Sequence, residues 1–334
     1  MRHFRFSVLF SLLALPAAFA WGQKTVLGGM QALILALFLG IMEVSLSFDN
    51  AVVNASVLRH LEEKWRRYFL TWGILIAVFG MRLVLPLLIV ALATGLEWTE
   101  VVRTALLQPE EYARHVQAAH IPIAAFGGMF LLMVFLAFLF DEGKTLHWLG
   151  AVEEKLAAVG KVESIEIVVA LLALLSVEVF LPEAEKLGAL IAGIWGIVAF
   201  VLTDSLSDSF AVSAQVPIRS GILGFLYLQV LDASFSLDGV VGAFAITKDV
   251  VVIMLGLGIG AMFVRSLTVF LVHKGTLEQY VFLEHGAFYA IGALALIMLT
   301  SMVVKVSEVI AGLVGVSLIV LSLISSIRYK AESI

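Results

Sequence analysis

Long apolar segments alternate with short polar connections along almost the whole chain. A helix that crosses a bilayer needs about 20 predominantly apolar residues. Segments of this kind lie at residues 27–58, 68–93, 120–140, 165–181, 187–203, 218–246, 250–273, 282–304 and 306–327. Together with an apolar run at the amino terminus, they predict an all-α, polytopic membrane protein with about 9–10 transmembrane helices.

The amino-terminal run has two interpretations. Arg2 and Arg5 precede an apolar stretch, and Ala18-Phe19-Ala20 resembles the small-residue cleavage site of a signal peptide. The same residues also suit a retained first helix whose arginines stay in the cytoplasm. Residues 1–26 are therefore expected to form an N-terminal helix or a signal-like segment.

One polar stretch interrupts the first long apolar segment. Residues 43–53 read EVSLSFDNAVV and place two carboxylates, two serines and an amide at the expected depth of the bilayer. A charged residue at the bilayer centre costs roughly 2.5–3.5 kcal/mol on insertion scales, so such residues face the protein interior and mark functional sites. The stretch recurs at 232–242 as DASFSLDGVVG, with Gly239 in the position of Asn50.

The duplication extends beyond this motif. Arg82 and Arg265 each stand nine residues after a glycine in the next apolar segment. The region 27–140 therefore forms a first three-helix repeat and 218–304 a second one, with two spans between them. Because each repeat has an odd number of spans, the second repeat must be inverted, and the basic loop 59–67 is assigned to the cytoplasm. Inverted repeats with polar interruptions are typical of secondary transporters.

The remaining regions complete the expected organisation. Residues 141–217 hold a polar stretch, 141–164, and two linker helices, while 305–334 form a C-terminal helix. Apolar residues recur at helical spacing in the polar stretch: Leu146, Leu149, Val152, Leu156 and Val159. This spacing predicts an amphipathic helix at the cytoplasmic surface. In the second repeat a GLGIG run, residues 256–260, is suited to close helix packing.

Composition narrows the functional classes. Of the 334 residues, 61% are hydrophobic and 14% are charged, whereas soluble domains carry about 25% charged residues. The lack of cysteine excludes disulfides, catalytic thiols and thiolate metal sites. No stretch is basic and aromatic enough to predict nucleic-acid binding. The GxSxG, HExxH and Walker A patterns are absent, as is the GxGD context of an intramembrane carboxylate protease, so we expect no enzyme.

Helix geometry separates the carboxylates of each motif. One face of a straight helix carries Glu43, Ser47, Asn50 and Asn54. Asp49 lies about 120° away from Glu43 on such a helix. Either the helices unwind near 47–50 and 236–239, which the short polar side chains favour, or each acid faces a different neighbour.

The charges of the two motifs suggest a ligand. The candidate metal-site residues are Glu43, Asp49, Asn50, Asp232 and Asp238, with Arg82 and Arg265 as charge-balancing residues. Four carboxylates against two guanidinium groups leave two negative charges, which one divalent cation would neutralise. Oxygen ligands without thiolate favour Mn²⁺, Mg²⁺ or Ca²⁺. The metal would be a substrate rather than a permanently bound cofactor. The alternative is that the acids pair with the arginines only to hold helices together.

Two histidines also occupy matching positions. His120 and His285 each stand seven residues before a glycine, near the start of the third helix of each repeat. They are interpreted as helix-start or interfacial residues, and a role as metal ligands or in a proton relay is the alternative.

The motifs resemble those of a known family. ExSLSFDNAVV and DASFSLDG, together with GFLYLQVLDASF, GAMFVR, LEHGAF and a closing SSIRY, resemble the TerC-like integral membrane proteins. The resemblance is closer to their bacterial branch that is named for a domain of unknown function, and it covers nearly the whole chain. The chain departs from the pattern at Asp232, where a Glu is expected, and at Gly239, where an Asn is expected. The polar stretch 141–164 and the additional helices also differ from a compact TerC core.

This resemblance implies a protein of the bacterial inner membrane in the LysE-type exporter superfamily, whose TerC members are linked to manganese efflux and tellurium resistance. By position, the four motif acids and Asn50 would bind the ion. The expected function is export of a divalent cation, with Mn²⁺ as the first candidate, by alternating access and with proton coupling. The alternatives are export of a small amino-acid-like solute and a non-transporting scaffold in metal or tellurite stress. Membrane lipid is an expected partner, and a homo-oligomer is compatible with this architecture.

Overall fold

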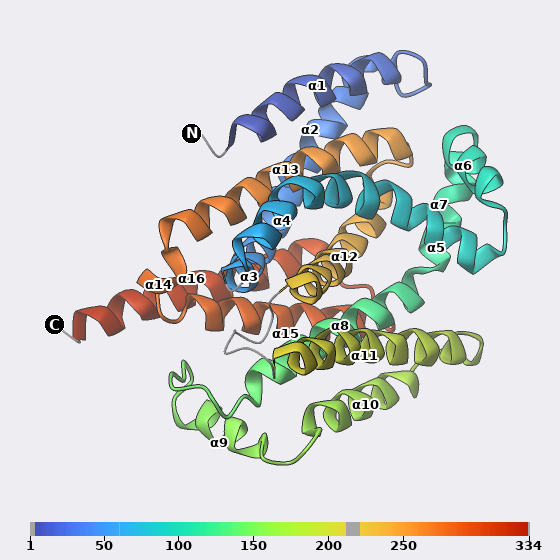
Figure 1. The fold of residues 1–334 in the computed structure, drawn as a ribbon. Helices are drawn as coiled ribbons and strands as arrows, with labels where there is room; N and C mark the ends of the chain where they lie inside the picture. Colours follow the sequence, from blue (N-terminus) through green and yellow to red (C-terminus); the bar gives the residue numbers. More distant parts are fainter. Residues whose placement is uncertain (1–3, 60, 212–220, 333–334) are drawn as a thin grey trace.

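The computed structural model describes residues 4–59, 61–211 and 221–332, and every regular element within these ranges is a helix. The long helices pack into one bundle, with both termini at the same end (Figure 1). Seven of the described helices are long and apolar enough to cross a membrane. They are α1 (Arg5–Gly22), α2 (Gly29–Leu46), α8 (His120–Leu139), α11 (Glu183–Ala211), α13 (Val250–Lys274), α15 (Leu283–Ser301) and α16 (Glu308–Glu332). The protein is therefore a polytopic helical membrane protein.

Three shorter helices occupy the predicted span 68–93. They are α4 (Glu63–Leu75), the π-helix η2 (Ile76–Val84) and α5 (Leu85–Thr94). The chain bends by 50° between α4 and the two helices that follow it. If α4 and these two helices are counted as one broken span, the described residues contain an eighth candidate span.

Other predicted elements are found with different lengths. Helix α12 (Gly221–Ile246) carries the second motif in 26 residues, a length of about 39 Å. Helix α10 (Ile165–Glu178) has only 14 residues, or about 21 Å, and is shorter than the ~30 Å hydrocarbon core that it was predicted to cross.

The predicted helix 27–58 is divided, because α2 ends at Leu46 and α3 (Phe48–Leu58) begins two residues later. The connection 94–119 contains two helices, α6 (Trp98–Leu107) and α7 (Pro109–Ala118).

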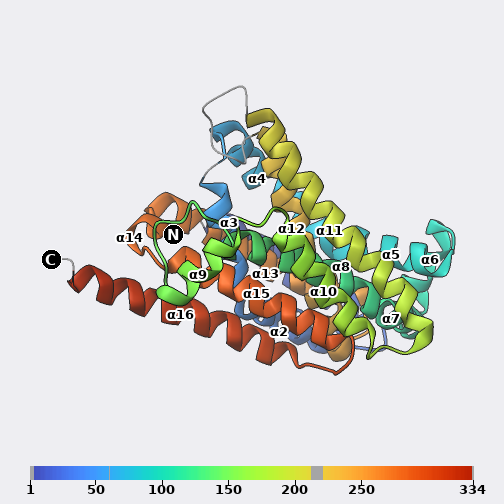
Figure 2. The same ribbon diagram turned by 90° about the horizontal axis from the view of Figure 1, so that it is seen from below.

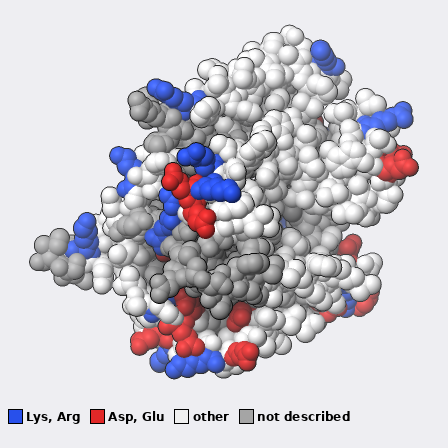
Figure 3. Space-filling view, viewed as in Figure 1, with Lys and Arg blue, Asp and Glu red and all other residues white. Residues whose placement is uncertain are grey.

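The surface fits a bilayer environment. Lys, Arg, Asp and Glu gather toward the two ends of the face in Figure 3, and a broad uncharged band lies between them. Seen from below, α16 lies along one edge of the bundle and α11 along the other, with α8, α12 and α15 between them (Figure 2). Large apolar side chains such as Leu12 and Ile34 are exposed on the outer helices, which is the arrangement expected where lipid replaces water as the solvent.

The third helices of the two repeats pack against each other in opposite directions. Phe138 of α8 stacks on Phe288 of α15 with 4.3 Å between ring centroids. At the other end of the contact, Gly127 faces Met298, whose Cε lies 2.7 Å from the position of an added Cβ. Residue numbers therefore rise along α8 as they fall along α15, which makes the pair antiparallel.

The motif helices are also antiparallel. The carboxylate of Glu43 lies against Gly239, with Oε2 3.2 Å from the position of an added Cβ. Further along, Asn54 Nδ2 donates to Oδ1 of Asp232 at 3.3 Å. The second helices follow the same rule, because Gly73 lies against Arg265 and Val78 lies against Gly258. Opposite directions in all three pairs are what two inverted repeats require.

The glycine run of α13 provides the predicted close packing. Gly256 lies against α2, where an added Cβ would be 2.8 Å from the Ala36 carbonyl oxygen. One turn later, an added Cβ on Gly260 would be 2.8 Å from the Gly40 carbonyl oxygen and would overlap the side chain of Glu43. The glycines therefore allow α13 to approach the first motif at backbone distance.

Helix α1 is held against the same helix by a buried polar contact. Ser7 is fully buried, and its Oγ donates to the Met262 carbonyl oxygen at 2.7 Å. The Oγ atom of Ser266 lies 2.6 Å from the same hydroxyl. The first helix is thus part of the packed bundle.

The polar stretch 141–164 contains one helix, α9 (Ala151–Val159). Leu149, which precedes α9, and Val152 and Val159 within α9 are exposed, as expected where a helix faces a membrane surface. The same helix buries Glu153 completely, which the sequence pattern did not predict.

Candidate functional site

The first motif lies at a break in the helix. Ser47 has φ −107° and ψ 22° between α2 and α3. The helical hydrogen bonds continue across it, from Ser47 N to the Glu43 carbonyl and from Ala51 N to the Ser47 carbonyl. The predicted unwinding near 47–50 is therefore confined to one residue.

The second motif does not break. Helix α12 continues without interruption from Gly221 to Ile246, so of the two alternatives for this motif, unwinding near 236–239 is not found. The sequences SLSFD and SFSLD are nearly the same, and the difference therefore comes from packing rather than from local propensity.

Arg82 lies within the π-helix η2. Pro86 follows one turn later, and because it has no N–H and clashes with the carbonyl four residues earlier, a regular α-helix cannot continue through this point. Nη1 of Arg82 donates to the Ala77 carbonyl oxygen at 2.6 Å. π-Helical turns are frequent at functional sites because they redirect side chains, and this one directs a guanidinium group toward the first motif.

Glu43 and Arg82 form a buried ion pair between Oε1 and Nη2. Glu43 is 4% exposed and Arg82 is 7% exposed. Ser47 Oγ donates to the same carboxylate oxygen at 3.3 Å. In a water-poor interior each charge would be costly alone, and each neutralises the other.

The matching arginine of the second repeat has different partners. Nη2 and Nε of Arg265 donate to the carbonyl oxygen of Phe69 at 2.7 and 3.1 Å, and its guanidinium carbon lies 3.7 Å from the centroid of the Phe69 ring. Asp232 attracts Arg265 electrostatically, but the described hydrogen bond to the Asp232 carboxylate comes from Asn54. The two repeats are thus not equivalent at the site.

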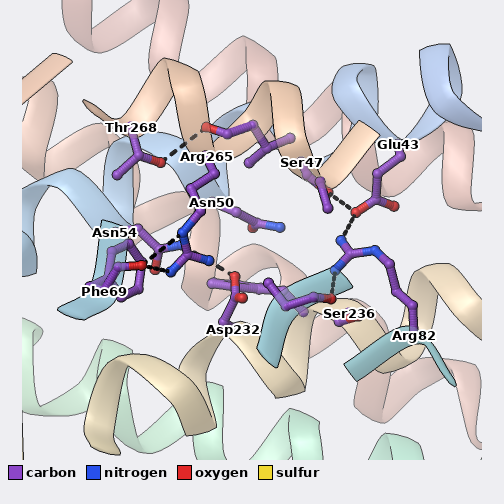
Figure 4. A pocket seen from close by; sticks show the side chains of 14 residues that line it. Glu43, Ser47, Asn50, Asn54, Phe69, Arg82, Asp232, Ser236, Arg265 and Thr268 are labelled. Atoms are coloured by element: carbon purple, nitrogen blue, oxygen red, sulfur yellow. Dashed lines mark hydrogen bonds and ion pairs between the residues drawn. The ribbon is translucent and has the colours of Figure 1, made fainter. Parts of the chain in front are cut away.

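These residues line one pocket between the repeats (Figure 4). It contains about 380 Å³ of empty space. Its described lining holds two carboxylates, from Glu43 and Asp232, and two guanidinium groups, from Arg82 and Arg265. The formal charge of this pocket is zero.

Several buried polar atoms of the pocket have no hydrogen-bond partner. They are Oδ1 of Asn50, Oδ1 of Asn54, Oγ of Ser236 and Nε of Arg82. Buried polar groups are almost always paired in folded proteins, so each exception calls for an explanation such as a missing ligand. Three of these four atoms are oxygens, which suit a hard cation or a hydrogen-bonding solute.

The other acids of the motifs lie elsewhere. Asp49 is buried and lines a second pocket with about 460 Å³ of empty space. The side chain of Asp238 lies outside the part of the chain that the structure describes. No described group of three or more His, Asp or Glu side chains is arranged to hold a metal ion. A single four-carboxylate cluster is therefore not seen among the described residues.

The matching histidines also lie apart from the pocket. His120 Nε2 is 3.4 Å from Ser301 Oγ. His285 Nε2 lies 2.9 Å from the Leu146 carbonyl oxygen and 3.6 Å from Oε1 of Glu153. His285 therefore fastens α15 to the polar stretch, close to the helix start, as expected.

A buried ion pair beside His285 was missed by the sequence analysis. Lys144 Nζ lies 2.9 Å from Oε1 of Glu153, and the Leu149 N–H donates to the other oxygen at 3.2 Å. Burial raises the pKa of Glu153, but the hydrogen bond and charge of Lys144, the Leu149 N–H and His285 together hold that pKa below its ordinary value. No sequence signal distinguished Glu153 from the exposed acids near it, because the spacing did not show which face of α9 would be buried.

Comparison with known proteins identifies the family. A family model described as "Protein of unknown function (DUF475)" matches residues 48–333, which is most of the chain. The match begins within the first motif and includes the second motif, Arg82 and Arg265. Comparisons with curated proteins and with solved structures gave no match. The chain, a polytopic helical membrane protein, belongs to the DUF475 family.

Proposed function

We propose that this protein is a transporter that exports a divalent metal cation, with Mn²⁺ as the first candidate, across the bacterial inner membrane. The observation that carries the proposal is the buried Glu43–Arg82 pair at a helix break, in a pocket lined by matching residues of two antiparallel repeats. Transporters with inverted repeats bind their substrates at such interrupted helices between the repeats.

Arg82 would act as a substitute for the substrate in the empty state. Its guanidinium group neutralises Glu43, while Arg265 is fastened to Phe69. A cation that binds between Glu43 and Asp232 would have to displace Arg82. The released Glu43 carboxylate and Asp232 would then give one divalent ion two negative charges, and the unpaired oxygens of Asn54 and Ser236 would add neutral oxygen donors.

Coupling to protons follows from the same chemistry, because a carboxylate that releases a cation can accept a proton. This would place the protein functionally with the TerC-like members of the LysE-type exporters that its motifs resemble. Residue similarity at the motifs is what supports this assignment, because the family match concerns proteins of unknown function.

The neutral charge of the pocket favours a second candidate substrate. A pocket with two carboxylates, two guanidinium groups and free amide oxygens complements a zwitterion, which carries one charge of each sign. A small amino-acid-like solute would pair its ammonium with Asp232 and its carboxylate with an arginine. The rival from another class is a membrane scaffold that transports nothing.

Transport by everted vesicles or proteoliposomes tests the proposal. Movement of Mn²⁺ is measured beside Mg²⁺, Ca²⁺ and Zn²⁺, with a pH-sensitive dye for protons and labelled amino acids as separate arms. We expect Mn²⁺ transport by the wild type and its loss in Glu43→Gln, Asp232→Asn, Asp49→Asn and Asp238→Asn.

Ser45→Ala is the matched control in the same motif. Ser45 is exposed and its hydroxyl donates to the Ile41 carbonyl of its own helix, so transport should be retained. Wild-type vesicles that move an amino acid but no metal would assign the second candidate. Vesicles that move neither would leave the scaffold.

A further inference from the structure

The second pocket beside the motif is chemically different from the first. Helices α2, α3, α12, α15 and α16 surround it, and its polar lining comes from Glu43, Ser47, Asp49 and Asn50. It shares Glu43, Ser47 and Asn50 with the first pocket, but none of its described lining residues is cationic. We call it the Asp49 pocket.

Asp49 is a buried carboxyl group without a described cationic partner. Oδ1 accepts a hydrogen bond from the Asn50 N–H at 3.0 Å. Oδ2 faces α16, where it lies 2.7 Å from the position of an added Cβ on Gly315. A buried carboxylate whose described donors are only the backbone N–H groups of Asn50 and of Asp49 itself is costly in a low-dielectric interior unless something else neutralises it.

A neighbouring atom also lacks a partner. Asn50 is 7% exposed, lines the Asp49 pocket, and its Oδ1 accepts no hydrogen bond. An acceptor can pair only with a donor or a cation. The unpaired amide oxygen of Asn50 and the Asp49 carboxylate without a cationic partner therefore both favour a cation at this place.

The charge count defines the kind of ion. Arg82 neutralises the charge of the Glu43 carboxylate through Oε1, while Oε2 lies beside Gly239. The charge that remains among the described lining residues is that of Asp49 alone. One monovalent cation balances it, whereas a divalent ion would leave a positive charge buried.

We propose that the Asp49 pocket binds a monovalent alkali cation, with Na⁺ as the probe, at a position distinct from the arginine-lined pocket. Its ligands are the Asp49 carboxylate, Asn50 Oδ1, Ser47 Oγ and Glu43 Oε2. Because both pockets share Glu43, an ion here is coupled to the Glu43–Arg82 pair. A contribution of this cation to coupling, beside that of protons, rests on the proposed transport function; the binding itself does not.

Thermal unfolding of the full-length protein in detergent tests the binding. NaCl is exchanged stepwise for choline chloride at constant ionic strength and pH, so that only the cation changes. Bound ligand stabilises the folded state in proportion to the logarithm of its excess over Kd. We expect the midpoint temperature to rise steadily with Na⁺ in the wild type, and Li⁺ and K⁺ to show how selective the site is.

Two variants locate the effect. Asp49→Asn keeps the size of the side chain and should abolish the Na⁺-dependent rise. Gly315→Ala keeps the charge but places a methyl group against Oδ2 of Asp49, so it should weaken Na⁺ binding by about tenfold or more, a shift that corresponds to roughly 1.4 kcal/mol.

Each variant has a matched control. Gly188→Ala adds a methyl group to α11, away from the Asp49 pocket, where the added Cβ meets no neighbouring helix within 4 Å. Asp141→Asn removes one charge from an exposed position. Both should retain the full response to Na⁺.

The outcomes are decisive. The proposal would be overturned if the wild type showed no Na⁺ response or if Asp49→Asn kept the full response. It would also be overturned if divalent ions, and not Na⁺, stabilised the protein through Asp49. A response to pH in place of Na⁺ would also overturn it and assign a proton to Asp49. A Na⁺ response that depends on Asp49 in vesicles that transport no metal would keep this site and reject the proposed substrate.

Discussion

Glu43 and Gly239 meet across the interface of the two motif helices, with Oε2 of Glu43 only 3.2 Å from the position of a Cβ on Gly239. The matching position in the first motif is Asn50, so the chain has replaced an amide with the smallest residue where the two motifs meet. The glycine leaves room for the carboxylate that pairs with Arg82. The size of residue 239 therefore controls the position of this carboxylate.

Gly239→Ala tests this relationship. Alanine is favoured over glycine in a helix by about 1 kcal/mol, so we expect equal or higher thermal stability. The added methyl group should displace the Glu43 carboxylate and reduce transport. Stability and transport are measured on the same preparation, and a variant that is stabilised with undiminished transport would contradict the argument.

The Glu43–Arg82 pair predicts non-additive effects on stability. Arg82→Gln leaves Glu43 charged and unpaired, and breaking a buried pair costs roughly 3–5 kcal/mol. Adding Glu43→Gln should recover much of this loss, as measured by thermal unfolding in detergent. Arg265→Gln combined with Glu43→Gln is the control, because Arg265 bonds to Phe69 and its effect should simply add.

The antiparallel packing of α8 and α15 predicts specific cross-links. The chain lacks cysteine, so introduced pairs react only with each other. Cysteines at Phe138 and Phe288, and at Gly127 and Met298, should cross-link with a short reagent. The exchanged combinations, Gly127 with Phe288 and Phe138 with Met298, use the same four variants but are separated by 10 or 11 residues of helix, about 15–16 Å. Efficient cross-linking of the exchanged pairs would mean parallel packing.

Opposite orientation of the repeats predicts labelling from opposite sides of the membrane. Glu63 and Lys248 are both exposed at helix ends. Glu63→Cys follows the first motif helix and should react with an impermeant thiol reagent only from the cytoplasmic side. Lys248→Cys follows the second motif helix and should react only from outside. If both label from one side, the repeats are not inverted.

The buried Lys144–Glu153 pair predicts a dependence of stability on pH. The pKa of Glu153 is lowered in the folded protein, so its contribution is present above the pKa of an unfolded glutamate, about 4.3, and is lost as the pH falls through the lower folded value. Glu153→Gln should lower the free energy of unfolding by roughly 1–3 kcal/mol at neutral pH. The difference from the wild type should shrink in acid.

The neighbouring residue Glu154 provides the control. It is exposed, and Glu154→Gln should change stability little at any pH. A constant difference between wild type and Glu153→Gln across the pH range would show that Glu153 acts through packing and not through its charge.

Much of the site could be predicted because its signals are local. A carboxylate in an apolar segment is costly wherever the helix lies, so Glu43 and Asp232 were found without knowledge of the fold. The duplicated spacing then identified Arg82 and Arg265. Helix periodicity also separated Asp49 from Glu43, and the structure places the two in contact with different helices, α16 and η2.

The partners of these groups could not be predicted, because they depend on tertiary packing. Equivalent positions in the sequence give Arg82 a carboxylate and Arg265 a backbone carbonyl. Pro86 has no counterpart in α13, where Val269 occupies the matching position. This difference explains why the segment that carries Arg82 is broken while α13 is continuous. The charge count for four acids assumed one shared pocket, whereas the structure places Asp49 and Asp232 on different pockets.

The contact of Ser7 with α13 has a consequence for the order of assembly. Its partners Met262 and Ser266 lie more than 250 positions later in the chain, with a separation of 255 residues for the first contact. At synthesis rates of roughly 5–20 residues per second, about 13–50 s pass before they emerge from the ribosome. The helix that enters the bilayer first must therefore wait in lipid, with its hydroxyl groups bonded to its own backbone. It can take its final place only when most of the protein has been made.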